Sequence, residues 1–336
     1  MEYRRLGRSG LKVSVLCLGA MMFGERTDEA EAGRIVASAR EAGVNFVDTA
    51  DAYAKGESER MLGRLIAADR ERWVVATKVG NTGAPAPNDA DLSRRHVMRA
   101  IDASLGRLGL DHVDLYYLHV DDAGTPLEET VTTMGDLVRA GKIRYWGVSN
   151  FRAWRLAEAA MLADRIGVPR PAVCQPYYNA VNRMPEVEVL PACEHFGLGV
   201  VPYSPLARGV LTGKYRPGEP PPADTRAGRG DKRMMQTEFR AESLAIAAKI
   251  KAHAERRGMR AAEFAFNWVL NSAAVTSVLA GPRTMEQWSA YLGALGRGFA
   301  AEDEALMDAL VAPGHPSTPG FNDPRYPVTG RRPQVR

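Results

Sequence analysis

The sequence predicts an α/β protein built as a single (β/α)8 TIM barrel. Short apolar runs alternate with amphipathic stretches along most of the chain, and this alternation repeats eight times. The apolar runs are nearly uninterrupted, as expected of parallel strands that are buried on both faces. Eight strand–helix units is the number that closes a barrel. An open doubly wound sheet is the alternative, but no GxGxxG turn follows the first apolar run.

The elements are read from hydrophobic periodicity. The predicted strands are Val15–Met21, Asn45–Asp48, Trp73–Lys78, Val113–His119, Ile143–Ser149, Ala172–Gln175, Leu198–Tyr203 and Thr276–Leu279. Apolar residues spaced by three and four follow each strand and predict helices. These helices span Thr27–Ala42, Ser58–Ala68, Ser93–Leu108, Leu127–Ala140, Ala153–Ile166, Glu186–Phe196, Ala241–Arg257, Ala261–Ser272 and Met285–Leu295. Thr27 is expected to cap the first helix and Gly43 to end it.

Three segments fall outside the repeat. Tyr3–Lys12 predicts an N-terminal β-hairpin that closes the barrel bottom. Leu206–Arg240 is a long loop after strand seven, rich in Gly, Pro and Arg, and loops of this length are commonly functional or disordered. A Pro-rich C-terminal tail, residues 313–336, follows a last helix near Glu302–Leu310. Around Phe321–Tyr326 it either folds over the barrel mouth or is a disordered end, and the barrel is expected to occupy residues 1–312.

The composition is that of a soluble cytoplasmic protein. Of the 336 residues 45% are hydrophobic, and 44 basic residues are interspersed with 40 acidic ones, a balance that argues against nucleic-acid binding. Cys17, Cys174 and Cys193 form no CxxC pair and predict buried thiols in a reducing compartment. No run approaches the ~20 apolar residues of a membrane helix. No HExxH or Cys/His cluster predicts a metal site, and a monomer or homo-oligomer is expected.

Polar residues stand where successive predicted strands end. Strand two ends in Asp48, strand three in Lys78 and strand four in His119, and Tyr53 lies in the loop after strand two. In a barrel the carboxyl ends of the strands form the active-site face. Each residue alone has an ordinary interpretation, as a cap, a solvated charge, a structural histidine or surface packing. Four of them at neighbouring strand ends, with complementary chemistry, favour an active site.

These four side chains have the chemistry needed to reduce a carbonyl group. The reaction delivers a hydride to carbon and a proton to oxygen. A tyrosine has a pKa of ~10, and the ammonium of Lys78 is expected to lower the pKa of Tyr53 while Asp48 holds that ammonium in place. His119 is expected to orient the carbonyl or to share the proton.

The chain resembles the aldo-keto reductases from about Tyr3 to Leu295. The matching segments are Asn45–Tyr53, Ala76–Lys78, Tyr116–His119, Gly141–Arg144, Gly147–Phe151, Gln175 with Tyr178-Asn179, and Tyr203–Tyr215. The resemblance implies an NADP-dependent oxidoreductase that converts an aldehyde or ketone to an alcohol, reversibly. It implies that Tyr53 is the general acid, that Lys78 and Asp48 adjust its pKa, and that His119 positions the carbonyl. The carbonyl substrate and the physiological direction stay open.

The resemblance also implies the contacts of NADPH around the nicotinamide. The backbone of Gly19, Ala20 and Met21 would approach the nicotinamide ribose, with Asp48 nearby. Three side chains would bind the carboxamide, namely Ser149, Asn150 and Gln175. Tyr203 would stack on the ring and fix the face that delivers hydride.

Two further segments suit the phosphates of the cofactor. The loop Leu206–Lys214 bears Gly209 and carries Arg208 and Lys214, so it offers a cradle for a pyrophosphate. The resemblance adds Ser204 and Pro205 to the cofactor contacts. Gly281 and Arg283 precede the last barrel helix, where backbone N–H groups and a guanidinium favour a phosphate monoester. In the family this place binds the adenosine 2′-phosphate, which favours NADPH over NADH, and Gln287 matches an adenosine contact. Tyr291 stands where the family usually has asparagine, which leaves the adenine contact open.

A second class of function stays open from the sequence. The same fold serves as a cofactor-sensing regulatory subunit, as in proteins resembling potassium-channel β subunits. The four catalytic-type residues do not separate the two classes. A binding role predicts tight cofactor retention, slow turnover and a stable partner protein.

Overall fold

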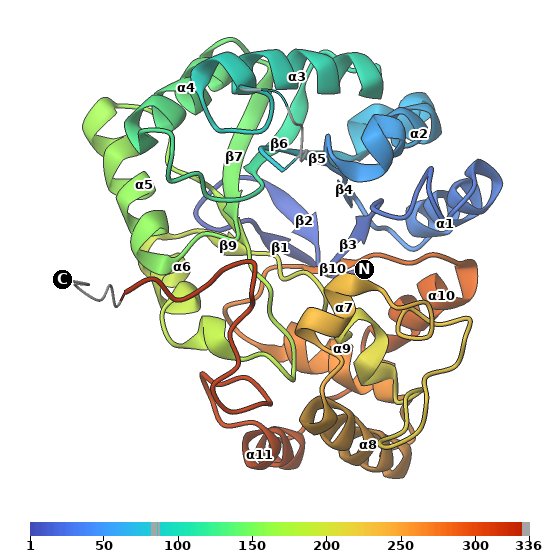
Figure 1. Ribbon diagram of the computed structural model, residues 1–336. Coiled ribbons are helices and arrows are strands. Elements are labelled where there is room, and N and C mark those ends of the chain that lie inside the picture. Colours follow the sequence, from blue (N-terminus) through green and yellow to red (C-terminus); the bar gives the residue numbers. More distant parts are fainter. Residues whose placement is uncertain (82–85, 87, 331–336) are drawn as a thin grey trace.

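A closed barrel of eight parallel strands forms the centre of the protein (Figure 1). The computed structural model describes residues 1–81, 86 and 88–330; positions 331–336 of the predicted tail lie outside the described residues. The strands are β3 (Leu16–Gly19), β4 (Phe46–Asp48), β5 (Val74–Val79), β6 (Val113–Leu118), β7 (Ile143–Ser149), β8 (Val173–Gln175), β9 (Gly199–Val200) and β10 (Val278–Ala280). They lie in the order β10-β3-β4-β5-β6-β7-β8-β9. Backbone N–H groups of Thr276 and Leu279 donate to Val200 (2.8 Å) and Pro202 (3.0 Å), which joins the two ends of this order. The predicted barrel is confirmed.

Helices surround the barrel, as Figure 1 shows. They are α1 (Glu29–Glu41), α2 (Glu57–Ile66), α3 (Arg94–Leu108), α4 (Leu127–Arg139), α5 (Ala153–Ile166), α6 (Val189–Phe196), α7 (Lys232–Thr237), α8 (Ala241–Arg256), α9 (Ala261–Asn271), α10 (Met285–Ala294) and α11 (Ala301–Leu310). Short 3₁₀ helices are η1 (Tyr53–Gly56), η2 (Ala67–Arg72), η3 (Met184–Glu186) and η4 (Ala207–Thr212). The predicted Thr27 cap of the first helix is wrong. The Asp28 carboxylate accepts the N–H of Glu31 instead, because the Thr27 hydroxyl donates to the carbonyl of Arg283 at 2.9 Å.

The N-terminal hairpin closes the bottom of the barrel, as predicted. Strands β1 (Tyr3–Arg5) and β2 (Lys12–Ser14) pair in antiparallel fashion. Leu6 and Val13 from this hairpin are fully buried and pack inside the barrel with Phe46. These side chains therefore fill the interior at the amino ends of the strands.

Side chains along each strand alternate between the barrel interior and the layer under the helices. On β5, Val74 and Ala76 belong to the interior cluster, whereas Val75 packs in the outer cluster. The same period carries the side chain of Lys78 to the inner rim. Continuing it on every strand gives one ring of rim residues: Gly19, Asp48, Lys78, His119, Ser149, Gln175, Tyr203 and Gly281. The alternation thus brings residues that are far apart in sequence to one site.

The segments outside the barrel are structured in their described parts. The long loop after β9 contains η4 and the six-residue helix α7, which is too short to give a clear periodic signal in the sequence. The C-terminal tail leaves α11 and returns to the barrel (Figure 1). The N–H of Ser317 donates to the carbonyl of Val181 at 2.9 Å, and Pro316 bridges to Asn182. The tail is therefore attached to the loop that follows β8.

Candidate active site

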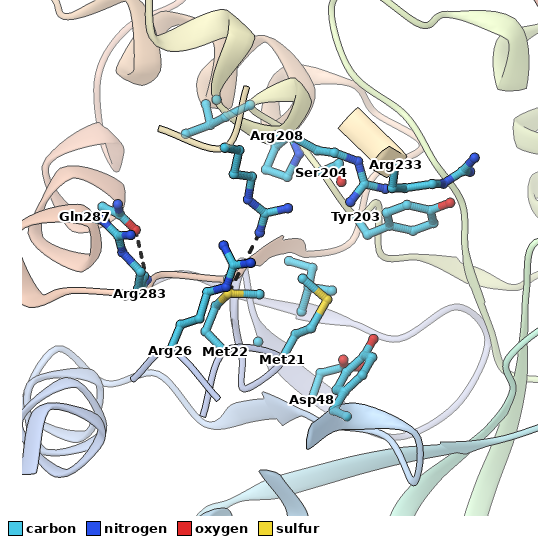
Figure 2. Close-up of a pocket in the computed structure, with 18 of the residues that line it drawn as sticks. Met21, Met22, Arg26, Asp48, Tyr203, Ser204, Arg208, Arg233, Arg283 and Gln287 are labelled. Carbon is cyan, nitrogen blue, oxygen red and sulfur yellow. Dashed lines mark hydrogen bonds between the residues drawn. The ribbon is translucent and has the colours of Figure 1, made fainter. Parts of the chain in front are cut away.

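A cavity of about 560 Å³ opens at the carboxyl ends of the strands. Asp48 and Tyr203 lie toward one end of it, and Arg283 and Gln287 lie toward the other (Figure 2). The cavity is lined by these predicted site residues: Gly19, Met21, Asp48, Tyr53, His119, Ser149, Asn150, Gln175, Tyr203, Ser204, Pro205, Leu206, Arg208, Gly209, Lys214, Gly281, Arg283 and Gln287. Of the remaining predicted residues, Lys78 is fully buried next to Asp48, and Ala20 is buried behind the rim. The structure therefore brings the predicted residues into one elongated site.

Asp48 and Lys78 form a buried ion pair beneath the cavity. The ammonium of Lys78 donates to one carboxylate oxygen of Asp48 and to the carbonyl of Thr49 at 2.7 Å. The amide of Gln175 donates to the other Asp48 oxygen at 2.9 Å. Burial alone would lower the pKa of Lys78, but the neighbouring Asp48 carboxylate reverses this and holds the pKa above its usual value. The ammonium therefore stays charged, in a fixed position.

Tyr53 lies directly above this ion pair, at the start of η1. Its hydroxyl oxygen is 3.4 Å from the Lys78 nitrogen, which lies 4.9 Å from the centre of the tyrosine ring. The expectation of a lowered pKa for Tyr53 is wrong in its net direction. Burial raises the pKa of Tyr53, and the lowering by the Lys78 charge is smaller than this effect. The phenol therefore keeps its proton at neutral pH, as a general acid must.

His119 packs edge-on against Tyr53, with 5.8 Å between ring centres and an interplanar angle of 86°. Burial holds the pKa of His119 well below its usual value, and the positive charges of Lys78 and Arg325 lower it further. The imidazole is neutral at physiological pH. It is suited to hydrogen-bond a substrate oxygen, which leaves Tyr53 as the group with a proton to transfer.

A hydrogen-bonded network fixes the rim beside these residues. Asn150 adopts a left-handed conformation with φ of 59° at the end of β7. Its amide nitrogen donates to the carbonyl of His119 at 2.8 Å and to the Ser149 hydroxyl at 3.0 Å. Its amide oxygen accepts from the Tyr203 hydroxyl at 2.8 Å, and the Tyr203 ring stacks on Tyr177. These contacts orient polar groups and one aromatic ring toward the cavity.

The opposite end of the cavity gathers positive charge. Lys214, Arg226 and Arg283 line it together. Burial lowers the pKa of Lys214, and the charges of Arg283 and Arg226 lower it further. Like charges held close in a partly buried site are costly until an anion binds. This end of the cavity therefore suits a polyanionic ligand, although the guanidinium of the predicted phosphate ligand Arg208 is paired with Glu238 at 3.1 Å.

Helix α10 begins at this basic end. The Thr284 hydroxyl caps the helix, and the side-chain oxygen of Gln287 accepts the backbone N–H of Arg283 at 2.8 Å (Figure 2). Gln287 thus holds the loop that presents Arg283. The ring of Tyr291 also lines the cavity and contacts Phe266 edge-on, with 5.5 Å between ring centres. Tyr291 therefore presents an aromatic side chain to the cavity at this end.

Sequence reasoning missed a set of mainly basic residues. These are Arg26, Asn81, Arg226, Arg229 and Arg233, all of which line the cavity. Arg325 and Tyr326 line it too, and they belong to the tail segment that the sequence offered as one that folds over the barrel mouth. Arg226 and Arg229 carried a weak signal, because they lie in the Arg- and Gly-rich part of the long loop. The other missed positions have no local pattern that distinguishes them from solvated surface residues.

The described residues contain no group of three or more His, Cys, Asp or Glu side chains placed to hold a metal ion. All three cysteines are free and buried, as the sequence predicted. In the part of the chain that the structure describes, no helix has the length and apolar character needed to cross a membrane.

Comparison with known proteins identifies the family. The model of the aldo/keto reductase family matches residues 15–312. The chain belongs to the aldo/keto reductase family. This confirms the resemblance stated from the sequence. Membership of the family supports an oxidoreductase that acts on carbonyl groups.

Relatives within this aldo/keto reductase family carry different names. A probable voltage-gated potassium channel subunit beta of Arabidopsis thaliana is 40% identical over 286 residues, which cover 84% of this chain and 87% of that protein. The uncharacterized oxidoreductase YrpG of Bacillus subtilis is 38% identical over 301 residues, covering 85% and 89%. The L-glyceraldehyde 3-phosphate reductase of Escherichia coli K12 is 33% identical over 329 residues, covering 94% and 93%. The relatives thus include both a named enzyme and a named channel subunit.

Proposed function

We propose that this aldo/keto reductase uses NADPH to reduce an aldehyde or ketone to an alcohol, in the cytoplasm. One observation carries the proposal. The Tyr53 hydroxyl lies 3.4 Å from a buried, charged lysine and beside a neutral histidine, at one end of a cavity whose other end is basic. Proton donor and polyanion site therefore belong to a single elongated pocket, as reduction by a phosphorylated hydride donor requires.

The residues fit NADPH by their charge. The crowding of Lys214, Arg226 and Arg283 would be relieved by phosphate groups. Arg283, beside the start of α10, would hold the 2′-phosphate that distinguishes NADPH from NADH. When bound, NADPH supplies the hydride. Ser149, Asn150, Gln175 and Tyr203 are proposed to hold the nicotinamide end.

The proton is proposed to come from Tyr53. As negative charge develops on the carbonyl oxygen, the phenol gives up its proton and the ammonium of Lys78 stabilises the phenolate that forms. Asp48 and the Thr49 carbonyl keep this ammonium fixed, so no reorganisation is needed during the step. The neutral His119 positions the carbonyl oxygen within reach of the phenol. The same groups serve alcohol oxidation in reverse.

Replacing Tyr53 by phenylalanine tests the assignment. Tyr53→Phe should lower kcat by roughly 10²–10⁴-fold, the usual contribution of a positioned general acid. NADPH binding, followed by fluorescence, should stay near the wild-type value, because the basic end is untouched. Tyr145→Phe, a change lower on β7 and away from the cavity, is the matched control. Normal turnover in Tyr53→Phe would show that the acid lies elsewhere.

A cofactor-sensing regulatory subunit is the second candidate function. The 40% identity to a probable potassium channel subunit beta favours it. So does Arg226, whose guanidinium approaches the sulfur of Met22 at 3.8 Å from the loop after β9 and so bridges the cleft. A bridge of this kind would slow cofactor exchange. Rapid-mixing kinetics separate the two roles: a burst of one equivalent followed by very slow cofactor release favours sensing, and sustained turnover favours the enzyme.

A further inference from the structure

The C-terminal tail is held against the barrel from Pro316 to Pro327. Beyond the Val181 and Asn182 contacts, the guanidinium of Arg240 donates to the hydroxyls of Ser317 (3.1 Å) and Thr318 (2.8 Å). The same guanidinium stacks on the ring of Phe321, with 3.7 Å from its carbon to the ring centre. These contacts give the tail a fixed path toward the cavity, and residues 316–327 are called the strap below.

The strap reaches the end of the cavity that holds Tyr53 and His119. Asp323 forms a bidentate ion pair with Arg233, with one contact at 2.6 Å. Figure 2 places Arg233 beside Tyr203, on the side of the cavity away from Arg283. The carbonyl of Tyr326 accepts from Arg152 at 2.7 Å, just before the start of α5. Two anchors on different elements therefore flank the strap residue Arg325.

Arg325 itself lines the cavity and is solvent-exposed. Its guanidinium donates to the side-chain oxygen of Asn81, three residues beyond Lys78 on the chain, and lies 5.8 Å from the ring of Tyr326. Among the described residues, no carboxylate lies within 4.0 Å of this guanidinium, whereas Arg233 is neutralised by Asp323. The strap thus delivers one unneutralised positive charge to the cavity.

This charge is separate from the basic end that suits the phosphates. Arg325 influences the protonation of His119, whereas Arg226 and Arg283 influence that of Lys214. Coulombic influence falls with distance, so the two groups of cations serve different parts of the cavity. When the phosphates of a cofactor occupy the basic end, the guanidinium of Arg325 stays free to bind a group of the substrate beside His119.

We propose that Arg325 is a specificity residue that binds an anionic group of the substrate, so that the preferred substrates are aldehydes or ketones bearing a carboxylate or phosphate. This inference rests on the proposed reductase function. A guanidinium offers a planar fork of donors that matches either oxyanion. Its exposed position lets the anion arrive from solvent, and the strap anchors limit the entropy lost when it binds.

The test compares matched substrates that differ in charge. Wild-type protein and Arg325→Gln are assayed with NADPH on 4-oxobutanoate against butanal, and on glyceraldehyde 3-phosphate against glyceraldehyde. The variant should lose about tenfold in kcat/KM on the better anionic substrate, mainly through KM, and change less than about twofold on its neutral partner. Added salt should reduce the wild-type preference. The pair with the larger loss identifies carboxylate or phosphate as the preferred anion.

Two further variants sharpen the comparison. Arg144→Gln removes an exposed arginine near the start of β7, at the opposite end of the barrel, and should leave both preferences unchanged. Arg325→Glu should disfavour the anionic partner more strongly than Arg325→Gln does. Equal changes on charged and neutral substrates, or a wild-type protein with no preference for the anion, would overturn the role of Arg325.

The inference and the proposed function fail in different ways. Lack of NADPH oxidation with every aldehyde would reject the reductase proposal. Arg325 would then still be tested by titrating the NADPH complex with 4-hydroxybutanoate and with inorganic phosphate, followed by cofactor fluorescence. Binding that is lost in Arg325→Gln and kept in Arg144→Gln supports an anion site, and equal affinity in both variants rejects it.

Discussion

The ionisation of Asp51 is expected to lower the free energy of unfolding by an amount that follows from the structure. Asp51 lies in the loop between β4 and Tyr53, with 9% of its surface exposed. Neither carboxylate oxygen has a hydrogen-bond partner of good geometry among the described residues. Burial, together with the negative charge of the fully buried Glu59, raises the pKa of Asp51 from 3.8 to about 7. Ionised Asp51 is therefore a source of instability immediately behind the proposed general acid.

The effect on stability has a definite sign. Because the pKa is raised by folding, the folded protein binds this proton more tightly than the unfolded chain does. The carboxyl is neutral in both states only well below pH 3.8, so the penalty vanishes there. The penalty grows between pH 4 and 7 and is complete above pH 7. At ~1.4 kcal/mol for each pH unit between the two pKa values, it reaches on the order of 4 kcal/mol.

Asp51→Asn removes this ionisation and keeps the shape of the side chain. The free energy of unfolding of the variant, minus that of the wild type, should rise by about 3–4 kcal/mol between pH 4.5 and pH 8.5. Equilibrium urea unfolding of the cofactor-free protein at both pH values measures it. Because the variant is compared with the wild type at both pH values, any effect of the amide on stability that does not depend on pH cancels. Glu71→Gln, at an exposed position, is the control. A difference that does not change with pH would refute the buried-carboxylate reasoning.

Three other substitutions test the site and its scaffold. Arg283→Ala should weaken NADPH binding by roughly ten- to a hundredfold while changing NADH binding little, and equal losses in fluorescence titrations would remove the 2′-phosphate role. Lys78→Met leaves Asp48 buried without its partner, so urea unfolding should show a loss of about 3–5 kcal/mol at pH 7, and wild-type stability would contradict the ion pair. Gly63→Ala would place a methyl group 2.1 Å from the carbonyl of Leu108 where α2 meets α3, so Tm should fall by several degrees rather than rise as for a free helix position.

The rim of catalytic-type residues could be predicted because it depends on short-range sequence patterns. A strand is recognised from its apolar run. Once a barrel is inferred, the last residues of each strand are expected at the active-site face, because the carboxyl ends of the strands form that face. Asp48, Lys78 and His119 needed only this reasoning, since the period of two places each on the inward face. The proposed general acid, Tyr53, required in addition that the loop after β4 turn back over the barrel.

The protonation states could not be predicted from the residue types. The sequence pairs a tyrosine with a lysine and so favours a lowered pKa for Tyr53. Burial decides the balance in the opposite direction, and the depth of burial depends on how η1 and its neighbours pack over the rim. The raised pKa of Asp51 likewise depends on its distance from Glu59, which belongs to α2.

The sequence by itself determined the barrel, the order of its elements and the identity of the residues on its inner rim, because these follow from local periodicity. Tertiary structure alone decided which side chains of the long loop and of the tail complete the site. Most of the barrel lies between Lys78 and Arg325 in the sequence, yet Arg325 contacts Asn81 near the end of β5. Arg240, Arg233 and Arg152 hold the strap in the position that makes this contact possible. Such contacts form between side chains with no common period, so no sequence pattern encodes them.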